Sequence, residues 1–222
     1  MACGTGHLVA AALERGALSE GVDFSQSMID FARRTYPLAS FRVADAANLP
    51  YDDRSMHAVT CSFGLSHMEN PQAGVDEAFR VLKAGGRFAF TLWYGGEEHS
   101  EQYALVKTAL ARYVKGDFEL PEEWVQLRYA DEQACEAITR RSGFEVPVFK
   151  RLPIVWRTSS AQRVVDVFDK LSIRTKLILD QQPPAVRLQI QEYLLSEAEA
   201  RWRDGVISLA WPALLTVVQK PL

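Results

Sequence analysis

The first 94 residues alternate between short apolar segments and amphipathic segments, and this alternation constrains the fold more than any other feature of the sequence. Apolar residues at strand spacing predict strands at 20–24, 40–44, 57–63 and 87–94. Residues at helical spacing predict helices at 8–15, 25–34 and 71–84. Repeated strand, crossover helix and strand predict an α/β protein with a mostly parallel sheet covered by helices on both faces.

The second half of the chain has a different pattern. Amphipathic helices are predicted at 100–115, 131–141, 161–179 and 184–203, and strands at 144–156 and 206–218. The sequence contains no internal repeat and no clean linker. We therefore expect one domain over residues 1–222, with helical lid or insertion segments at 96–143 and 158–205 and an antiparallel strand at the C-terminal end.

Composition and charge exclude several classes of protein. The formal net charge of −3 argues against a mainly electrostatic nucleic-acid binder. No apolar run reaches the roughly 18 to 20 residues that would span a bilayer, and the N-terminus is not a signal peptide. The three cysteines are far apart and form no metal-binding pattern. We expect a cytoplasmic protein with reduced thiols, no metal and no membrane span.

A glycine turn, Gly4-Thr5-Gly6, opens the first helix. Glycines let a backbone approach a ligand and leave the helix N-terminal amides pointing toward it. The turn alone is weak evidence, and it does not complete the dinucleotide fingerprint, because Val9 stands where glycine or alanine is needed. Val9 therefore argues against a nicotinamide-dependent oxidoreductase.

Two carboxylates follow the next two strands. Asp23 ends one strand, seventeen residues after Gly6, and Asp45 directly follows the other. In a parallel sheet both lie at the carboxyl edge, where ligands bind. Asp23 can accept hydrogen bonds from a ribose diol, and Asp45 can accept from an exocyclic amine. A helix N-terminal charge and an Asx-turn are the corresponding structural alternatives.

These motifs resemble those of class I S-adenosylmethionine-dependent methyltransferases, in particular the ubiquinone- and menaquinone-biosynthesis type. Five short segments carry the resemblance in the right order: Ala2-Cys3-Gly4-Thr5-Gly6, Gly21-Val22-Asp23-Phe24-Ser25, Ala44-Asp45-Ala46, Phe63-Gly64-Leu65-Ser66-His67 and Arg80-Val81-Leu82-Lys83-Ala84-Gly85-Gly86. The resemblance covers residues 2 to about 95. It implies a Rossmann-like doubly wound sheet, S-adenosyl-L-methionine as cofactor, and methyl transfer to a small-molecule acceptor.

The resemblance also implies roles for the residues of the first two motifs. Gly4 and Gly6 would line the methionine part of the cofactor. Asp23 would hold the ribose hydroxyls, and Phe24 and Met28 would pack near the adenine.

The later motifs would complete the site. Asp45 and Ala46 would read the adenine edge, and Ser62 and Phe63 would face the sulfonium and the acceptor. His67 lies just beyond and is the candidate general base, which is needed only when the acceptor loses a proton. The alternative is that His67 only packs or forms a hydrogen bond after the strand.

The largest departure from the family is at the start of the chain. The family has a strand immediately before the glycine loop, between the strands that correspond here to 20–24 and 57–63. Without it, two rows of backbone groups lack partners, each costing on the order of 1 to 3 kcal/mol if buried. We therefore expect the first strand to be missing and the sequence to be an incomplete version of a longer protein, with Met1 an internal methionine.

The truncated start keeps a second functional class open. A non-catalytic relative, acting as a binding or interaction module, would retain the fold without turnover. The intact Gly4, Gly6, Asp23 and Asp45 argue against this reading. The sequence indicates neither the identity of the acceptor nor the oligomeric state.

Overall fold

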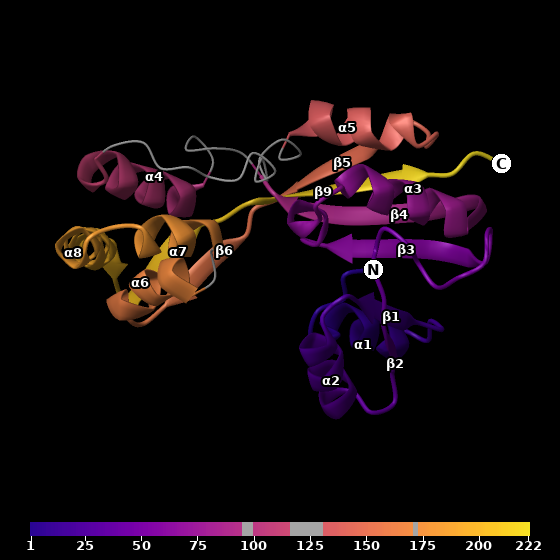
Figure 1. Cartoon of the computed structure of the whole chain (residues 1–222), viewed down its shortest axis with the longest axis horizontal. Coiled ribbons are helices and arrows are strands. Elements are labelled where there is room, and N and C mark those ends of the chain that lie inside the picture. Colours follow the sequence, from indigo (N-terminus) through magenta and orange to yellow (C-terminus); the bar gives the residue numbers. More distant parts are fainter. Residues whose placement is uncertain (95–99, 116–130, 171–172) are drawn as a thin grey trace. The chain divides into compact units, whose positions relative to one another are not determined.

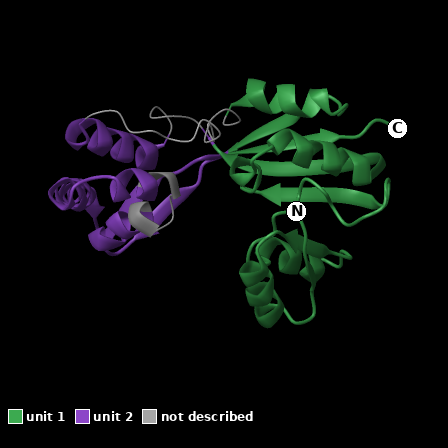
Figure 2. Ribbon diagram, viewed as in Figure 1, with its two compact units in different colours: residues 1–93, 128–151, 214–222 green, residues 94–127, 152–213 purple. Residues whose placement is uncertain are grey.

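A computed structural model describes residues 1–94, 100–115, 131–170 and 173–222. The chain divides into two compact units (Figure 2). Unit 1 comprises residues 1–93, 128–151 and 214–222, and unit 2 comprises residues 94–127 and 152–213. None of the helices in these described ranges is long and apolar enough to cross a membrane.

The N-terminal part of unit 1 alternates helices and strands, as predicted. The elements are α1 (His7–Glu14), β1 (Glu20–Asp23), α2 (Gln26–Thr35) and β2 (Ser40–Val43) (Figure 1). Strands β1 and β2 pair in parallel. Helix α2 begins after Ser25, whose hydroxyl accepts a hydrogen bond from the Met28 N–H at 3.4 Å, a typical N-cap. The helices bury a small core against the strands, made of Val9, Ile29, Ala32 and Phe41.

The rest of unit 1 is built on a four-stranded sheet in the order β3-β4-β9-β5. Its elements are β3 (Met56–Ser62), the short 3-10 helix η1 (Leu65–His67), α3 (Pro71–Val81), β4 (Leu82–Trp93), α5 (Glu132–Arg141), β5 (Val148–Leu152) and β9 (Ala213–Gln219). Strands β3 and β4 are parallel. The Gly85 N–H donates to the Lys220 carbonyl and the Tyr94 N–H to the Pro212 carbonyl, so β9 runs antiparallel to β4, as predicted.

The sheet of unit 1 is interrupted between β1 and β3. Among the described residues, β1 pairs with β2 and β3 pairs with β4, with no strand between them. The first residues of the chain lie in this gap: the Met1 ammonium donates to the Thr60 carbonyl at 2.8 Å, and the Cys3 N–H donates to the Val22 carbonyl at 2.9 Å. Backbone hydrogen bonds from the first residues of the chain therefore reach both β1 and β3.

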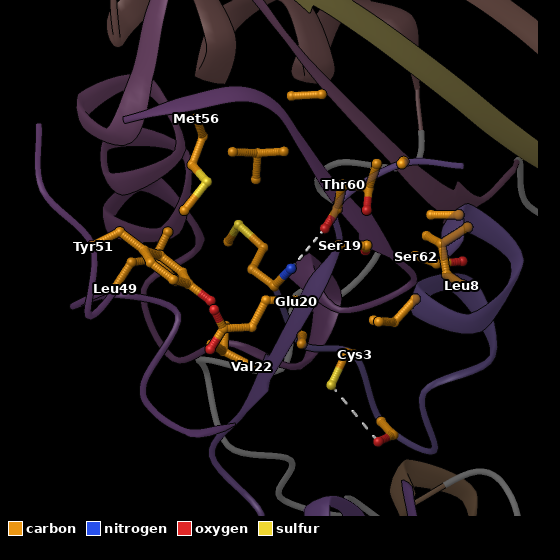
Figure 3. A pocket seen from close by; sticks show the side chains of 18 of the residues that line it. Cys3, Leu8, Ser19, Glu20, Val22, Leu49, Tyr51, Met56, Thr60 and Ser62 are labelled. Carbon is orange, nitrogen blue, oxygen red and sulfur yellow. Dashed lines mark hydrogen bonds between the residues drawn. The ribbon is translucent and has the colours of Figure 1, made fainter. Parts of the chain in front are cut away.

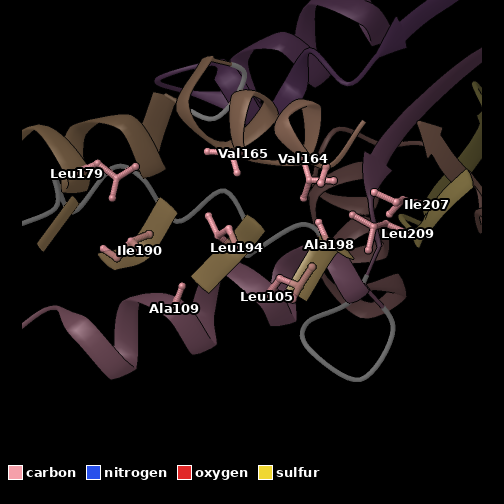
Figure 4. Close-up of a cluster of buried hydrophobic side chains, with 11 residues drawn as sticks. Leu105, Ala109, Val164, Val165, Leu179, Ile190, Leu194, Ala198, Ile207 and Leu209 are labelled. Carbon is pink, nitrogen blue, oxygen red and sulfur yellow. The ribbon is translucent and has the colours of Figure 1, made fainter. Parts of the chain in front are cut away.

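Unit 2 combines four helices with a three-stranded antiparallel sheet among its described residues. The helices are α4 (Glu101–Tyr113), α6 (Ala161–Lys170), α7 (Ile173–Asp180) and α8 (Pro184–Ala200). The sheet has the order β6 (Val155–Thr158), β8 (Val206–Ala210) and β7 (Trp202–Arg203). The buried side chains of its core, among the residues described, are aliphatic and include Leu105, Val164, Ile190, Leu194, Ile207 and Leu209 (Figure 4). This unit is stabilised by its own buried core.

Several predicted element boundaries differ from the structure, and three of the differences have identifiable reasons. The strand predicted at 144–156 is two strands in different sheets, β5 and β6, which separate at Pro153; the strand predicted at 206–218 breaks at Pro212 in the same way. Proline has no N–H to donate to a strand ladder. Helix α3 ends at Val81 rather than at the glycine pair, because Leu82 is fully buried and already belongs to β4.

Candidate functional site

The glycine turn forms a loop whose backbone only glycine adopts without strain. Gly4 has φ +50° and Gly6 has φ +86°. A Cβ atom on Gly6 would lie 2.7 Å from Cζ of Phe41 and 3.1 Å from Cβ of Ala32, so the absence of a side chain lets α1 pack tightly on β2 and α2. A Cβ atom on Gly4 would meet no atom within 4 Å. Gly6 therefore serves packing, whereas Gly4 borders open space.

Asp23 ties the glycine loop to the end of β1. It is 7% exposed, its Oδ2 accepts from the Gly4 N–H at 2.8 Å, and its Oδ1 accepts from the Ser25 N–H at 3.0 Å. A carboxylate offers about four lone-pair sites, so each oxygen keeps acceptor capacity for a ligand. The structure thus brings Gly4 and Asp23 together, as predicted from their positions at the carboxyl edge.

Asp45 lies beside Asp23 at the next strand end. The Ala44 N–H donates to the Asp23 carbonyl at 3.0 Å, which aligns the two strand ends. Oδ1 of Asp45 accepts from the Ala47 N–H at 2.9 Å, an Asx-turn, and Asp45 is otherwise exposed. Ala46 is buried. Asp45 therefore forms the Asx-turn that was the structural alternative to a binding role, and it also remains accessible to a ligand at the same edge as Asp23.

Arg80 fixes the chain that follows Asp45. Its guanidinium donates to the Leu49 carbonyl at 3.0 Å and to the Tyr51 carbonyl at 2.8 Å, and it pairs with Glu77 and Asp53. Hydrogen bonds from Arg80 hold the pKa of the Glu77 carboxyl below its ordinary value. The loop between β2 and β3 is thereby anchored to α3, which restricts where Asp45 can lie.

Phe24 and Met28 form an exposed apolar rim next to Asp23. Phe24 is 77% exposed and Met28 is 43% exposed, although both are large hydrophobic side chains. Both flank the start of α2, one at the strand end and one in the first helical turn. Solvated apolar side chains beside a carboxylate can cover the flat face of a ligand ring.

The carboxyl end of β3 closes on the glycine loop from the other side. A Cβ atom on Gly64 would lie 2.5 Å from Cβ of Ala2, so the turn after β3 touches the loop. The Ser62 hydroxyl lies 3.2 Å from the Thr91 hydroxyl of β4. Sequence reasoning missed the parts played by Gly64 and Thr91. For Gly64, the sequence does contain a signal: a glycine that directly follows Phe63 at the end of an apolar strand.

Phe63 adopts a strained backbone at this edge. Its φ of +58° is unusual for an aromatic residue, and its ring stacks on Trp93 with centroids 4.2 Å apart and planes at 24°. The Phe63 N–H donates to the Thr91 carbonyl at 3.0 Å. Non-glycine residues held in this conformation gather at functional sites, because the surrounding structure must compensate for the strain.

His67 ends η1, one turn beyond Phe63. Its backbone N–H donates to the Gly64 carbonyl at 3.0 Å. Desolvation by neighbouring protein atoms lowers the pKa of the imidazole from its ordinary value of 6.5, although part of the side chain remains exposed. This shift favours the neutral imidazole, the state that can accept a proton.

A cavity of about 470 Å³ in unit 1 overlaps this edge only in part, and Figure 3 shows side chains that line it. Of the predicted cofactor residues, only Gly4 and Ser62 line it. Asp23, Asp45 and Met28 lie outside its lining. Unit 1 therefore has a polar edge around Asp23 and, sharing Gly4 and Ser62, a mostly apolar cavity between β1 and β3.

Residues 1–90 match the family model described as a methyltransferase domain. The demethylmenaquinone methyltransferase of Clavibacter sepedonicus is 46% identical over 90 residues, which cover 39% of this chain and 37% of that protein. The corresponding enzyme of Chlorobaculum tepidum is 41% identical over 87 residues, covering 39% and 36%. The matched part thus spans little more than a third of these curated relatives.

Solved structures share the fold over the whole chain. The YcgJ protein of Bacillus subtilis has a TM-score of 0.62 at 19% identity, covering 100% of this chain and 90% of that one. The phosphoethanolamine N-methyltransferase 2 of Haemonchus contortus, solved in complex with S-adenosyl-L-methionine, has a TM-score of 0.54 at 16% identity, covering 100% and 47%. At these identities the likeness concerns the fold.

Proposed function

We propose that this chain is an S-adenosyl-L-methionine-dependent methyltransferase with a small-molecule acceptor. Residues 1–90 match the methyltransferase-domain model, and the fold is that of class I methyltransferases. The observation that carries the proposal is the buried Asp23 carboxylate, bound to the Gly4 N–H at 2.8 Å and adjacent to the strand end that bears Asp45. This is a polar cradle for a nucleoside, with open space above Gly4.

The residues fit the cofactor in several respects. The spare acceptor capacity of Asp23 suits a ribose diol, and the exposed carboxylate of Asp45 suits an exocyclic amine. Phe24 and Met28 supply apolar cover for an adenine ring. When bound, S-adenosyl-L-methionine supplies a methyl group on a positively charged sulfur. Ser62 and the strained Phe63 would face that group from the end of β3.

The chain's part in methyl transfer is mainly positional. Holding the acceptor in line and excluding water lowers the barrier without covalent participation by the protein. The names of the curated relatives support a reduced demethylmenaquinone-like acceptor, because an electron-poor methyl group reacts with an electron-rich carbon. The proton released by such an acceptor needs a base, which is the role proposed for His67.

Calorimetric titration with S-adenosylhomocysteine tests the proposal. We expect saturable binding at one site with a dissociation constant in the micromolar range, about −8 kcal/mol. NADH in a parallel titration is the control and should not bind, because Val9 interrupts the dinucleotide fingerprint. A folded circular dichroism spectrum without S-adenosylhomocysteine binding would favour the non-catalytic alternative.

The His67→Gln variant should lose about 10²-fold or more in kcat with reduced demethylmenaquinone as acceptor, since a positioned base contributes that order. Because desolvation lowers the pKa of His67, the wild-type rate should remain high down to a pH below 6.5 and fall only in more acidic solution. Binding of S-adenosylhomocysteine should be unchanged. An unaltered pH profile and kcat in the variant would show that His67 only packs.

The division of the chain into two units partly supports the proposed insertion segments at 96–143 and 158–205. Unit 1 is assembled from three separate stretches of sequence, as expected when another unit is inserted. Helix α5, within the first proposed segment, belongs to unit 1. Among the described residues, Cys3 and Cys61 form no disulfide, which supports the proposed cytoplasmic location.

A further inference from the structure

In the part of the chain that the structure describes, β5 forms one outer edge of the four-stranded sheet. Among the described strands, the order β3-β4-β9-β5 gives β5 one neighbour, β9 (Figure 1). The Glu145 N–H donates to the Gln219 carbonyl of β9 at 2.9 Å, so the backbone groups of Glu145 face inward. Successive residues of an extended chain present these groups to alternate sides. The backbone groups of Val146, Val148 and Lys150 therefore face outward, where they can pair with another strand.

The side chains along this edge alternate between covered and exposed. Pro147 is buried and Phe149 is half-buried, whereas Val146 is 64% exposed and Val148 is 69% exposed. This alternation fits an extended chain, and it places the proline at an inward position, where its missing N–H does not interrupt the outer edge. Two exposed valines beside outward-facing backbone groups are typical of an edge that pairs with another chain.

The charged residues of this segment are arranged symmetrically about Val148. Glu145 lies three positions before it, and Arg151 lies three positions after it. When two copies pair antiparallel with Val148 opposite itself, residue 145 of each copy lies opposite residue 151 of the other. In the two neighbouring registers that still pair outward-facing residues, Glu145 would lie opposite Phe149 or Pro153. Charge complementarity therefore selects the register centred on Val148.

The long side chains of the segment tolerate this pairing. Arg151 is exposed, and its Nε and Nη2 donate to the same Glu132 oxygen at 3.2 and 3.0 Å. A guanidinium has five N–H donors, so a second carboxylate can bind beside Glu132. Lysine on an edge strand ordinarily opposes pairing. In this register, however, Lys150 lies opposite Val146, and the two lysines are about 13 Å apart along the strands.

We propose that this chain forms a two-fold symmetric dimer in which β5 of unit 1 pairs antiparallel with β5 of a second copy, with Val148 opposite Val148. The outward-facing residues exchange main-chain hydrogen bonds, and a Glu145–Arg151 pair flanks them at each end. The pairing joins the two four-stranded sheets into one continuous sheet. A second copy fits this edge better than an unrelated peptide, because a two-fold axis requires the charge symmetry that the segment has.

Sedimentation velocity over a range of protein concentrations measures the dimerisation. We expect a monomer–dimer equilibrium with a dissociation constant on the order of 10 μM, because one pair of strands buries less surface than a stable dimer interface. In hydrogen exchange, the amides of Val146, Val148 and Lys150 should exchange about tenfold more slowly in the dimer than in the monomer. A protein that stays monomeric up to roughly 200 μM, or a dimer without this protection, would overturn the proposal.

Two single charge reversals test the register. Glu145→Arg sets arginine opposite arginine, and Arg151→Glu sets glutamate opposite glutamate, so each variant alone should dimerise about tenfold more weakly or worse. An equimolar mixture of the two variants should form mixed dimers with the affinity of the wild type, because both flanking pairs again join opposite charges. If the mixture dimerises no better than the single variants, residues 145 and 151 do not meet across a two-fold axis and the proposal is wrong.

Val148→Lys is a second test, which does not depend on the folding of the charge variants. It brings two ammonium groups together at the axis, where paired Cα atoms are about 5.5 Å apart, and should abolish dimerisation. The matched control Val43→Lys makes the same change at an exposed valine of β2, in the two-stranded sheet, and should leave dimerisation unchanged. Circular dichroism verifies the fold of each variant. Wild-type dimerisation by a folded Val148→Lys would contradict the proposal.

Discussion

The Gly6→Ala variant should lose about 2 to 5 kcal/mol of unfolding free energy. Two costs combine. A left-handed backbone at φ +86° is strained for alanine, and the new Cβ would lie 2.7 Å from Cζ of Phe41. Phe41 is 4% exposed and Ala32 is fully buried, so neither neighbour can move aside without disturbing the core. Urea denaturation with an unchanged m-value measures the loss.

Gly16→Ala is the matched control. Gly16 has φ +80°, close to that of Gly6, but a Cβ atom there would meet nothing within 4 Å. Its cost should be about 1 to 2 kcal/mol, from backbone strain alone. The difference between the two variants isolates the packing of α1 against Phe41. Equal losses would mean that the close contact at Gly6 has no energetic consequence.

Local sequence signals were sufficient for the first 94 residues. The N-cap at Ser25, the proline at the start of α3 and the alternation of apolar residues place the elements within five residues. Asp23 and Gly4 were predicted to converge because both end up at the carboxyl edge of parallel strands. That inference needs only strand order and direction, which the alternation of helices and strands supplies.

Features that depend on distant contacts were not predictable in the same way. The stack of Phe63 on Trp93 joins two strand ends that are thirty positions apart in the chain. Residues 144–156 have strand character throughout, yet Val148–Leu152 and Val155–Thr158 pair in different sheets. Local propensity cannot indicate which partner a strand selects, because cross-strand packing decides it.

The Asp23→Ala variant should weaken S-adenosylhomocysteine binding about 10²-fold or more. Each hydrogen bond to a charged group contributes about 1.5 to 3 kcal/mol, and a ribose diol would make two. The substitution also leaves the Gly4 and Ser25 N–H groups without their acceptor. The loop that borders the proposed site would then lose its anchor, which weakens binding further. Calorimetric titration measures the loss.

The control for this prediction must separate binding from folding. Asp30→Ala removes a half-buried carboxylate from α2, where Asp30 accepts an exposed hydrogen bond from Gln26 at 2.7 Å. It should leave S-adenosylhomocysteine affinity within about twofold, since exposed surface contacts contribute little. Asp23→Asn keeps the size of the side chain but removes its charge. If Asp23→Asn retains the native circular dichroism spectrum and loses affinity while Asp30→Ala does not, the carboxylate charge binds the nucleoside. Wild-type affinity in a folded Asp23→Asn would assign Asp23 to holding the glycine loop alone, and the nucleoside site would have to lie elsewhere.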